Sequence, residues 1–312
     1  MIARIEALMQ HDVAGDPCTG LRWTRRTTRQ IARELRSVDI TISPGTVARL
    51  LKALRFSLRG NRKQLSRGSG ADRNEQFEYL AEQRTGFAAR ALPVVSVDSK
   101  KKELVGNFKN PGTAWNQTSE LVNDHDFRSD AVGMAIPYGL YDERANLGTV
   151  FVGTSHDTPE FAAQNIARWW EGEGRERYPG ARDLLVLADG GGSNGPRNRA
   201  FKAALQTRLC DLHRISVTVC HYPTGASKWN PIEHRLFSEI SKNWAGCPLR
   251  SYETMLNYIS TTRTETGLRV TAQLVTQEYA KGVKIPDALM ATLDIRPHEV
   301  QPLRNYTIHP RG

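Results

Sequence analysis

Two apolar segments that each end in an aspartate place the strongest constraint on how this chain can fold. They are VVSVD, which ends at Asp98, and LLVLAD, which ends at Asp189. Short uninterrupted apolar runs are typical of strands buried on both faces of an α/β sheet. Functional groups of such sheets gather beyond the carboxyl ends of the strands. A lone aspartate there is more often a turn former or a helix cap, but the pair predicts two acids at one sheet edge.

Strands and helices alternate around these two segments. The segments AIPYGLYD and GTVFVGT predict a strand pair, and SVTVCHYP predicts a further strand. Helices are expected over PEFAAQNIARWWEGEG, NRAFKAALQTRL and NPIEHRLFSEISKNW. This order predicts an α/β domain, a mixed sheet flanked by helices, over residues 93–250. We expect residues 251–312 to form a C-terminal extension that packs on this domain.

A third carboxylate, Glu233, lies in the first turn of the last of these helices, because Pro231 suits the first helical position. An acid at this position also compensates the helix dipole, so Glu233 alone does not indicate a site. Three carboxylates that converge without His or Cys favour hard cations such as Mg²⁺ or Mn²⁺. Two such ions can activate an attacking oxygen and stabilise a departing one in phosphoryl transfer. The four cysteines show neither zinc-site spacing nor a disulfide framework.

Residues 1–63 carry most of the net charge, +8 of a total of +10. Within them, TTRQIARELRS and SPGTVARLLKALRF show apolar residues at helical spacing, and Ser43 is a good N-cap for the second segment. Two short helices with flanking arginines predict a helix-turn-helix or winged-helix module that binds DNA, with FSLR as a wing strand. A generic helical hairpin with solvated arginines is the alternative. Residues 64–92 are expected to form a linker and a short helix.

Candidate DNA contacts lie in both regions. In the N-terminal module they are Arg25, Arg26, Arg29, Thr46 and Arg49. Near the acids they are Lys100, Lys101, Ser193, Asn194, Lys228 and Asn230. Solvated lysines and a helix-capping asparagine are the alternatives. The run Gly190–Gly192 lets a phosphate approach the backbone closely, but it lacks the GxGxxG context of a dinucleotide fold. His221 and Trp229 are expected to line the same cleft, where a structural histidine and a packed tryptophan are the simpler interpretations.

Several longer blocks resemble one known family. The blocks SVDSKKKELVGNFKN, AIPYGLYD, ADGGGSNG and CHYPTGASKWNPIEHRLFSEISKNW resemble the Rhodopirellula-type DDE transposase family, and NPIE is similar to a signature of the Tc/mariner superfamily. The resemblance implies an RNase H-like catalytic domain in which Asp98, Asp189 and Glu233 bind two Mg²⁺ or Mn²⁺ ions. It implies cleavage at transposon ends and attack of the freed 3′-hydroxyl on target DNA. The implied partners are double-stranded transposon-end and target DNA, and the implied assembly is a homo-oligomer on DNA.

Two other functions fit the same residues. Members of this family commonly carry a further helix-turn-helix ahead of the motif Gly15-Asp16-Pro17, which fourteen residues precede here. The chain could therefore be a truncated, non-cleaving DNA-binding remnant or regulator of the element. A stand-alone RNase H-like nuclease would share the acids without needing the DNA-binding module. No apolar run of about 18 residues and no signal peptide are present, so we expect a cytoplasmic protein without membrane contact.

Overall fold

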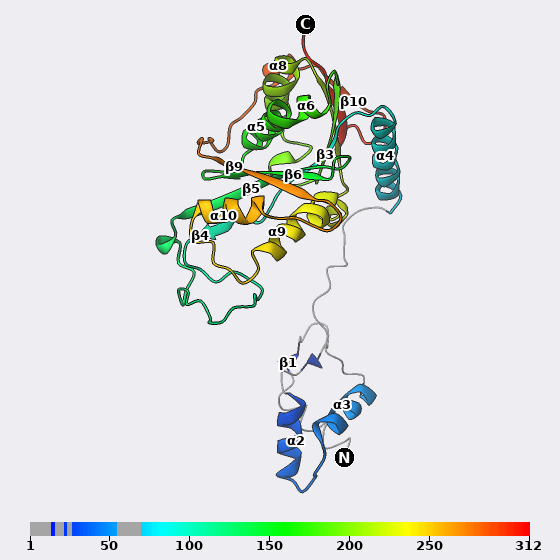
Figure 1. The fold of residues 1–312 in the computed structure, drawn as a ribbon. Helices are drawn as coiled ribbons and strands as arrows, with labels where there is room; N and C mark the ends of the chain where they lie inside the picture. The colour runs from blue at the N-terminus through cyan, green and yellow to red at the C-terminus, as the bar shows by residue number, and fades with distance from the viewer. Residues whose placement is uncertain (1–13, 16–21, 24–26, 55–69) are drawn as a thin grey trace. The chain divides into compact units, whose positions relative to one another are not determined.

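The computed structural model describes residues 14–15, 22–23, 27–54 and 70–312 (Figure 1). The chain divides into two compact units, Met1–Leu65 and Ser66–Gly312. None of the described helices is long and apolar enough to cross a membrane. The predicted wing strand FSLR and the candidate contacts Arg25 and Arg26 lie outside the described residues.

The described residues of the first unit form the two predicted helices and one pair of short antiparallel strands. These are β1 (Ala14–Gly15), β2 (Arg22–Trp23), α2 (Thr28–Arg36) and α3 (Pro44–Ala53). Helix α2 begins at a capping box formed by Thr27, and α3 begins where the Ser43 hydroxyl accepts a hydrogen bond from a backbone N–H. The apolar faces meet through Ile31, Leu35 and Val47, which are all buried. The helical spacing predicted from the sequence is therefore confirmed.

The described part of the second unit is built on a nine-stranded mixed sheet, as predicted for the α/β class. The strands are β3 (Val94–Ser99), β4 (Glu103–Val105), β5 (Gly133–Asp142), β6 (Leu147–Gly153), β7 (Asp183–Ala188), β8 (Ser216–His221), β9 (Arg269–Val275), β10 (Ile295–Pro297) and β11 (Asn305–Ile308). Along the sheet the order is β10-β11-β8-β7-β3-β5-β6-β9, and β4 pairs with β5. The central strands β3, β7 and β8 are parallel, and β5 is antiparallel to β3.

Helices cover both faces of this sheet, which explains why the central strands are apolar on both sides. The helices are α4 (Gly70–Ala89), α5 (Pro159–Trp169), α6 (Arg175–Arg177), α7 (Arg199–Leu205), α8 (Asp211–His213), α9 (Ser238–Asn243), α10 (Tyr252–Ser260) and α11 (Asp287–Met290). Helices α5, α6 and α8 lie on one side of the sheet, and α9 and α10 lie on the other (Figure 1). The buried side chains form one cluster with α5 and α7, and a second cluster with α9 and α10.

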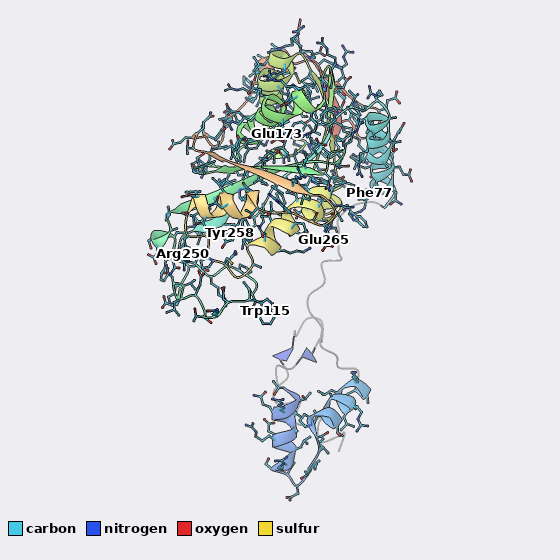
Figure 2. The ribbon with its side chains drawn as sticks, viewed as in Figure 1. Phe77, Trp115, Glu173, Arg250, Tyr258 and Glu265 are labelled. Atoms are coloured by element: carbon cyan, nitrogen blue, oxygen red, sulfur yellow. The ribbon has the colours of Figure 1, made fainter. Side chains whose placement is uncertain are left out.

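Helix α4 begins at Gly70, inside the polar stretch predicted to be a linker, and it is therefore longer than predicted. Its exposed positions are polar, which is why the sequence resembles a linker. Its inner side carries Leu80 and Phe87 in a buried cluster, with Phe77 packed against them (Figure 2). The buried Gln76 donates from Nε2 to a backbone oxygen of β8 at 2.9 Å. The helix is thus an integral part of the second unit.

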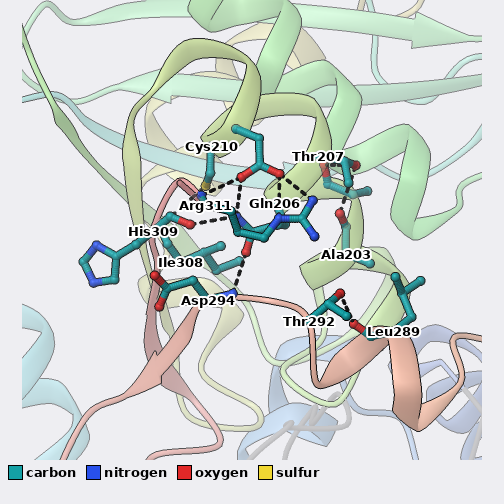
Figure 3. A network of polar contacts seen from close by, with 12 residues as sticks. Ala203, Gln206, Thr207, Cys210, Leu289, Thr292, Asp294, Ile308, His309 and Arg311 are labelled. Carbon is teal, nitrogen blue, oxygen red and sulfur yellow. Dashed lines mark hydrogen bonds and ion pairs between the residues drawn. The ribbon is translucent and has the colours of Figure 1, made fainter.

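The segment that follows residue 251 supplies strands to both edges of the sheet. Strand β9 pairs with β6 at one edge, and β11 pairs with β8 near the other. A polar network fixes the β10–β11 end to a π-helical turn, η4 (Gln206–Cys210) (Figure 3). The buried Gln206 donates from Nε2 to the His309 backbone oxygen at 2.7 Å, and its Oε1 accepts from the Asp294 backbone N–H at 2.9 Å. Gln206 therefore joins the C-terminal strands to a helical segment 88 to 103 residues earlier in the chain.

Candidate active site

The strand register brings two acids to one sheet edge. Strands β3 and β7 are parallel and align Val97 with Ala188. The next residues, Asp98 and Asp189, therefore lie side by side at the carboxyl ends of the two strands. Each carboxylate accepts a backbone hydrogen bond, Asp98 Oδ1 from the next residue at 2.7 Å and Asp189 Oδ1 from Gly191 at 3.2 Å. These bonds fix both carboxylates at the edge.

Glu233 reaches the same edge from a π-helical turn, η6 (Glu233–Phe237), which continues into α9. π-Helical turns occur frequently at functional sites. The turn is tied to the first acid's strand because the buried Asn230 donates from Nδ2 to the Val97 backbone oxygen at 3.3 Å. The Glu233 backbone N–H donates to the Asn230 backbone oxygen at 3.1 Å. Asn230 therefore positions the turn, and its buried side chain does not reach the surface as a DNA contact.

Two glycines in the sheet allow this turn to pack close to the strands. Gly139 in β5 is the register partner of Asp98. A Cβ at Gly139 would lie 2.6 Å from Phe237 Cε1, and a Cβ at Gly148 in β6 would collide with Leu236. The missing side chains therefore set the height of η6 above the sheet, and with it the position of Glu233. We did not predict this role from the sequence, although a glycine in the middle of the apolar strand AIPYGLYD indicates close approach of another segment.

The three carboxyl groups interact strongly. Burial, together with the neighbouring Asp189 and then Glu233, raises the pKa of Asp98 to about 8. Burial also raises the pKa of Asp189. The nearby Asp189 and Glu233 carboxyls thus both favour the protonated form of Asp98. Among the described residues, no group of three or more His, Cys, Asp or Glu side chains is already arranged around a metal position.

The donor set nevertheless fits a divalent cation. The side chains of Asp98, Asp189 and Glu233 offer only carboxylate oxygens, which Mg²⁺ and Mn²⁺ prefer. Burial is the main cause of the raised pKa of Asp98, and repulsion from the negative charges of Asp189 and Glu233 adds to it. A cation at the edge would relieve that repulsion. The residues are therefore chemically suited to the ion that the sequence resemblance implies.

The lysines predicted to contact DNA differ in whether their side chains are free to bind a ligand. Lys100 is only 11% exposed; its Nζ pairs with Glu103 Oε1 at 3.2 Å and lies 4.7 Å from the ring centre of Trp244. Because this charge is already engaged inside the protein, we leave Lys100 out of the proposed DNA contacts. Lys101 and Lys228 are exposed and remain available.

The polar residues after the glycine run are turned inward. Asn194 is 1% exposed and its Oδ1 accepts a hydrogen bond from the Tyr138 hydroxyl at 2.9 Å. Ser193 is also buried. The ring nitrogens of the fully buried His221 contact the backbone oxygens of Arg304 and Asn194 at 2.7 and 2.8 Å. In this structure Ser193, Asn194 and His221 support the site from beneath and do not line its surface.

Trp229 differs from the packed tryptophan suggested by the sequence. It is 57% exposed; its ring makes an edge-on contact with Phe77, with ring centres 6.1 Å apart, and Lys228 Nζ lies 5.2 Å from its ring centre. The simpler interpretation was wrong because Trp229 lies on the short 3₁₀ turn η5 (Ser227–Trp229), whose described residues carry no buried side chain. An exposed indole therefore stands four residues before Glu233.

In the first unit, the described candidates lie on the two helices. Arg29 on α2 and Arg49 on α3 are exposed. Thr46 is partly buried, and its hydroxyl lies 3.0 Å from the Ser43 hydroxyl at the start of α3. Thr46 therefore also contributes to the N-terminal turn of α3.

Comparison with known proteins places these observations in a family. A family model described as the Rhodopirellula transposase DDE domain matches residues 4–310. The solved structure of the Mos1 transposase paired-end complex with left transposon end is similar, with a TM-score of 0.44 and 15% identity over 83% of this chain and 69% of that chain. The catalytic domain of Mos1 mariner transposase gives a TM-score of 0.40 and 14% identity over 64% of this chain and 83% of that chain. No curated protein matches the sequence.

Proposed function

The chain belongs to the Rhodopirellula transposase DDE-domain family, and from this membership we propose that it cuts DNA at transposon ends and joins the freed ends to target DNA. The observation that carries the proposal is the meeting of three acids from β3, β7 and η6 at one sheet edge. Burial, together with the neighbouring Asp189 and Glu233, raises the pKa of Asp98. Perturbed carboxyl groups of this kind are typical of functional sites.

We assign Asp98, Asp189 and Glu233 as the catalytic acids, and as the ligands of two Mg²⁺ or Mn²⁺ ions. When bound, two such ions activate an attacking oxygen and stabilise a departing one in phosphodiester chemistry. The chain itself supplies the positioning. Parallel strands hold the two aspartates at neighbouring register positions. The Asn230 side chain binds η6 to β3, and the absence of side chains at Gly139 and Gly148 lets η6 pack against the sheet.

We further propose that the first unit is a helix-turn-helix module that binds double-stranded DNA. Its exposed Arg29 and Arg49 support this proposal, as does the concentration of positive charge in residues 1–63. Lys101 and Lys228 would contact DNA near the acids. Because transposition brings two ends together, we propose that the protein acts as a homo-oligomer on DNA, in the cytoplasm.

A cleavage and strand-transfer assay on DNA carrying the ends of the encoding element tests this function. With Mg²⁺ or Mn²⁺ the wild-type chain should cut and join, and Asp189→Asn should lower the rate by more than about 10³-fold. Asp183→Asn is the matched control, because Asp183 lies at the opposite end of the same strand. Equal activity of the two variants would show that the acid assignment is wrong.

A stability measurement gives a second, independent readout. Divalent ions that bind the folded protein should raise its melting temperature. We expect this rise in the wild type and in Asp183→Asn, but not in Asp189→Asn. DNA binding without cleavage under either metal would instead support the alternative of a non-cleaving regulator.

A further inference from the structure

A groove of about 850 Å³ opens beside Asp189. Its lining consists of residues 190–192 and 195–200, the segment 283–285, Thr224 and Arg304. Gly191 is one of the lining residues, and a Cβ there would lie 3.7 Å from Asp189 Oδ2. The groove therefore borders the acidic edge.

The groove carries positive charge only. Four of its lining residues are Lys or Arg, and none is Asp or Glu. Within the described part of the chain, the exposed side chains of Arg197 and Lys284 make no hydrogen bond or ion pair. These two cations belong to two different segments of the groove lining. Unpaired cations next to a cluster of acids indicate a ligand that is itself anionic along its length.

The other two cations hold the walls in place. Arg199 on α7 pairs with Asp287 at 2.6 Å and donates to the Ile285 backbone oxygen at 3.2 Å, which ties the 283–285 segment to α7. Arg304 donates to the Tyr222 backbone oxygen at 3.1 Å and to a threonine hydroxyl at 3.0 Å. Arg199 and Arg304 therefore stabilise the residues that line the groove, while Arg197 and Lys284 remain available to a ligand.

The floor of the groove is bare backbone. Gly191 and Gly192 are exposed, and Gly192 has a positive φ of 63°. Without side chains, this turn lets a phosphate approach the backbone closely. On the opposite wall, Val283 is 51% exposed and offers an apolar surface.

We propose that this groove binds one strand of DNA as it leaves the catalytic acids, with phosphates on Arg197 and Lys284 and a base against Val283. The inference rests on the proposed function and names the form of DNA that enters this part of the site. A volume of about 850 Å³ is that of a site for a small organic ligand, so it accommodates a few nucleotides of a single strand. A duplex, whose major groove alone is about 12 Å wide, is too large for it.

Binding of a fluorescein-labelled oligo(dT) of twelve nucleotides to the full-length chain in EDTA tests the groove without any cleavage. Each phosphate contact to a single strand contributes about 0.7 to the slope of log K against log salt, which is about fivefold in affinity at 0.1 M salt. Lys284→Ala should therefore weaken binding about fivefold, and Arg197→Ala/Lys284→Ala about 25-fold. Lys281→Ala is the matched control, since Lys281 is exposed and unpaired in the described chain but lies outside the groove lining.

Crosslinking locates the bound strand. Oligonucleotides that carry 5-iododeoxyuridine should crosslink to peptides from residues 190–200 or 281–287. Crosslinks confined to Met1–Leu65, no binding by the wild type, or equal affinities of Lys284→Ala and Lys281→Ala would each overturn the proposal. Failure of the proposed function is a separate result. Oligonucleotide binding that depends on Lys284, without any metal-dependent cleavage, would refute the transposase chemistry and retain the groove.

Discussion

Replacement of Gly139 by alanine should displace the turn that carries Glu233. Gly139 is paired with Asp98 in the sheet and lies directly under η6. An alanine Cβ would come within 2.6 Å of Phe237 Cε1 and 3.0 Å of Ile232 Cδ1. Carbon atoms in contact are separated by about 3.5–4.0 Å, so these two side chains must shift by about 1 Å. Both are buried, and we therefore expect the turn beside them to shift as well.

This displacement has two measurable consequences. Overpacking of a buried contact typically costs about 1–3 kcal/mol, so the free energy of unfolding should fall by that amount. A misplacement of about 1 Å can lower a catalytic rate about a hundredfold. Because the turn carries Glu233, we expect a loss of that size in the rate of metal-dependent DNA cleavage by Gly139→Ala.

Urea unfolding and the cleavage assay together test this reasoning. Gly86→Ala is the matched control, since Gly86 is an exposed position of α4 and a Cβ there meets nothing within 4 Å. Alanine stabilises a helix interior by about 0.5–1 kcal/mol relative to glycine, so this control should lose neither stability nor activity. The double variant Gly139→Ala/Phe237→Leu should recover part of the lost stability and part of the lost cleavage rate, because the smaller leucine relieves the contact with the new Cβ. If Gly139→Ala lost stability but cut DNA at the wild-type rate, the inference that packing at Gly139 positions Glu233 would be refuted.

Two further predictions concern stability. The pKa of Asp98 is raised to about 8 in the metal-free protein, against about 3.9 in an unfolded chain, so the folded state binds more protons and loses stability as pH rises through that window. In EDTA, the stability advantage of Asp98→Asn over the wild type should therefore grow from pH 5 to pH 8, and a gap independent of pH would contradict this assignment. Gln206→Leu should lower the free energy of unfolding by about 1–3 kcal/mol, because the His309 oxygen and the Asp294 N–H lose their buried partner; an unchanged urea midpoint would show that this network is dispensable.

Local patterns in the sequence were sufficient for the central strands and for the N-terminal helices. The segments that end at Asp98 and Asp189 are apolar throughout because helices cover both faces, and that pattern is visible without the fold. Ser43 marks the start of α3 by its own chemistry. The pairing of the two aspartates followed from the rule that parallel strands share their carboxyl ends.

Features that depend on distant segments could not be read in the same way. Most positions of strand β9 are exposed, with only Val270 and Val275 buried, and β10 has only three residues, so neither produces a strong apolar run. Lys100 and Asn194 lie close to the acids in sequence, but their directions depend on Trp244 and Tyr138, which belong to other elements. The groove was missed because its two free cations, Arg197 and Lys284, lie 87 positions apart in the chain.

The position of β11 has a consequence for the timing of folding during synthesis. Strand β8, the neighbour of the strand that leads to Asp189, pairs on its other side with β11. The Arg304 and Asn305 backbone and side chains also hold His221 and Gln76 in place. A ribosome-bound chain therefore lacks a complete sheet until residue 308 has emerged, whereas the first unit can fold much earlier. Under the proposed function, the sheet edge that holds the acids would be complete only after translation of the domain is finished, later than the proposed DNA-binding unit.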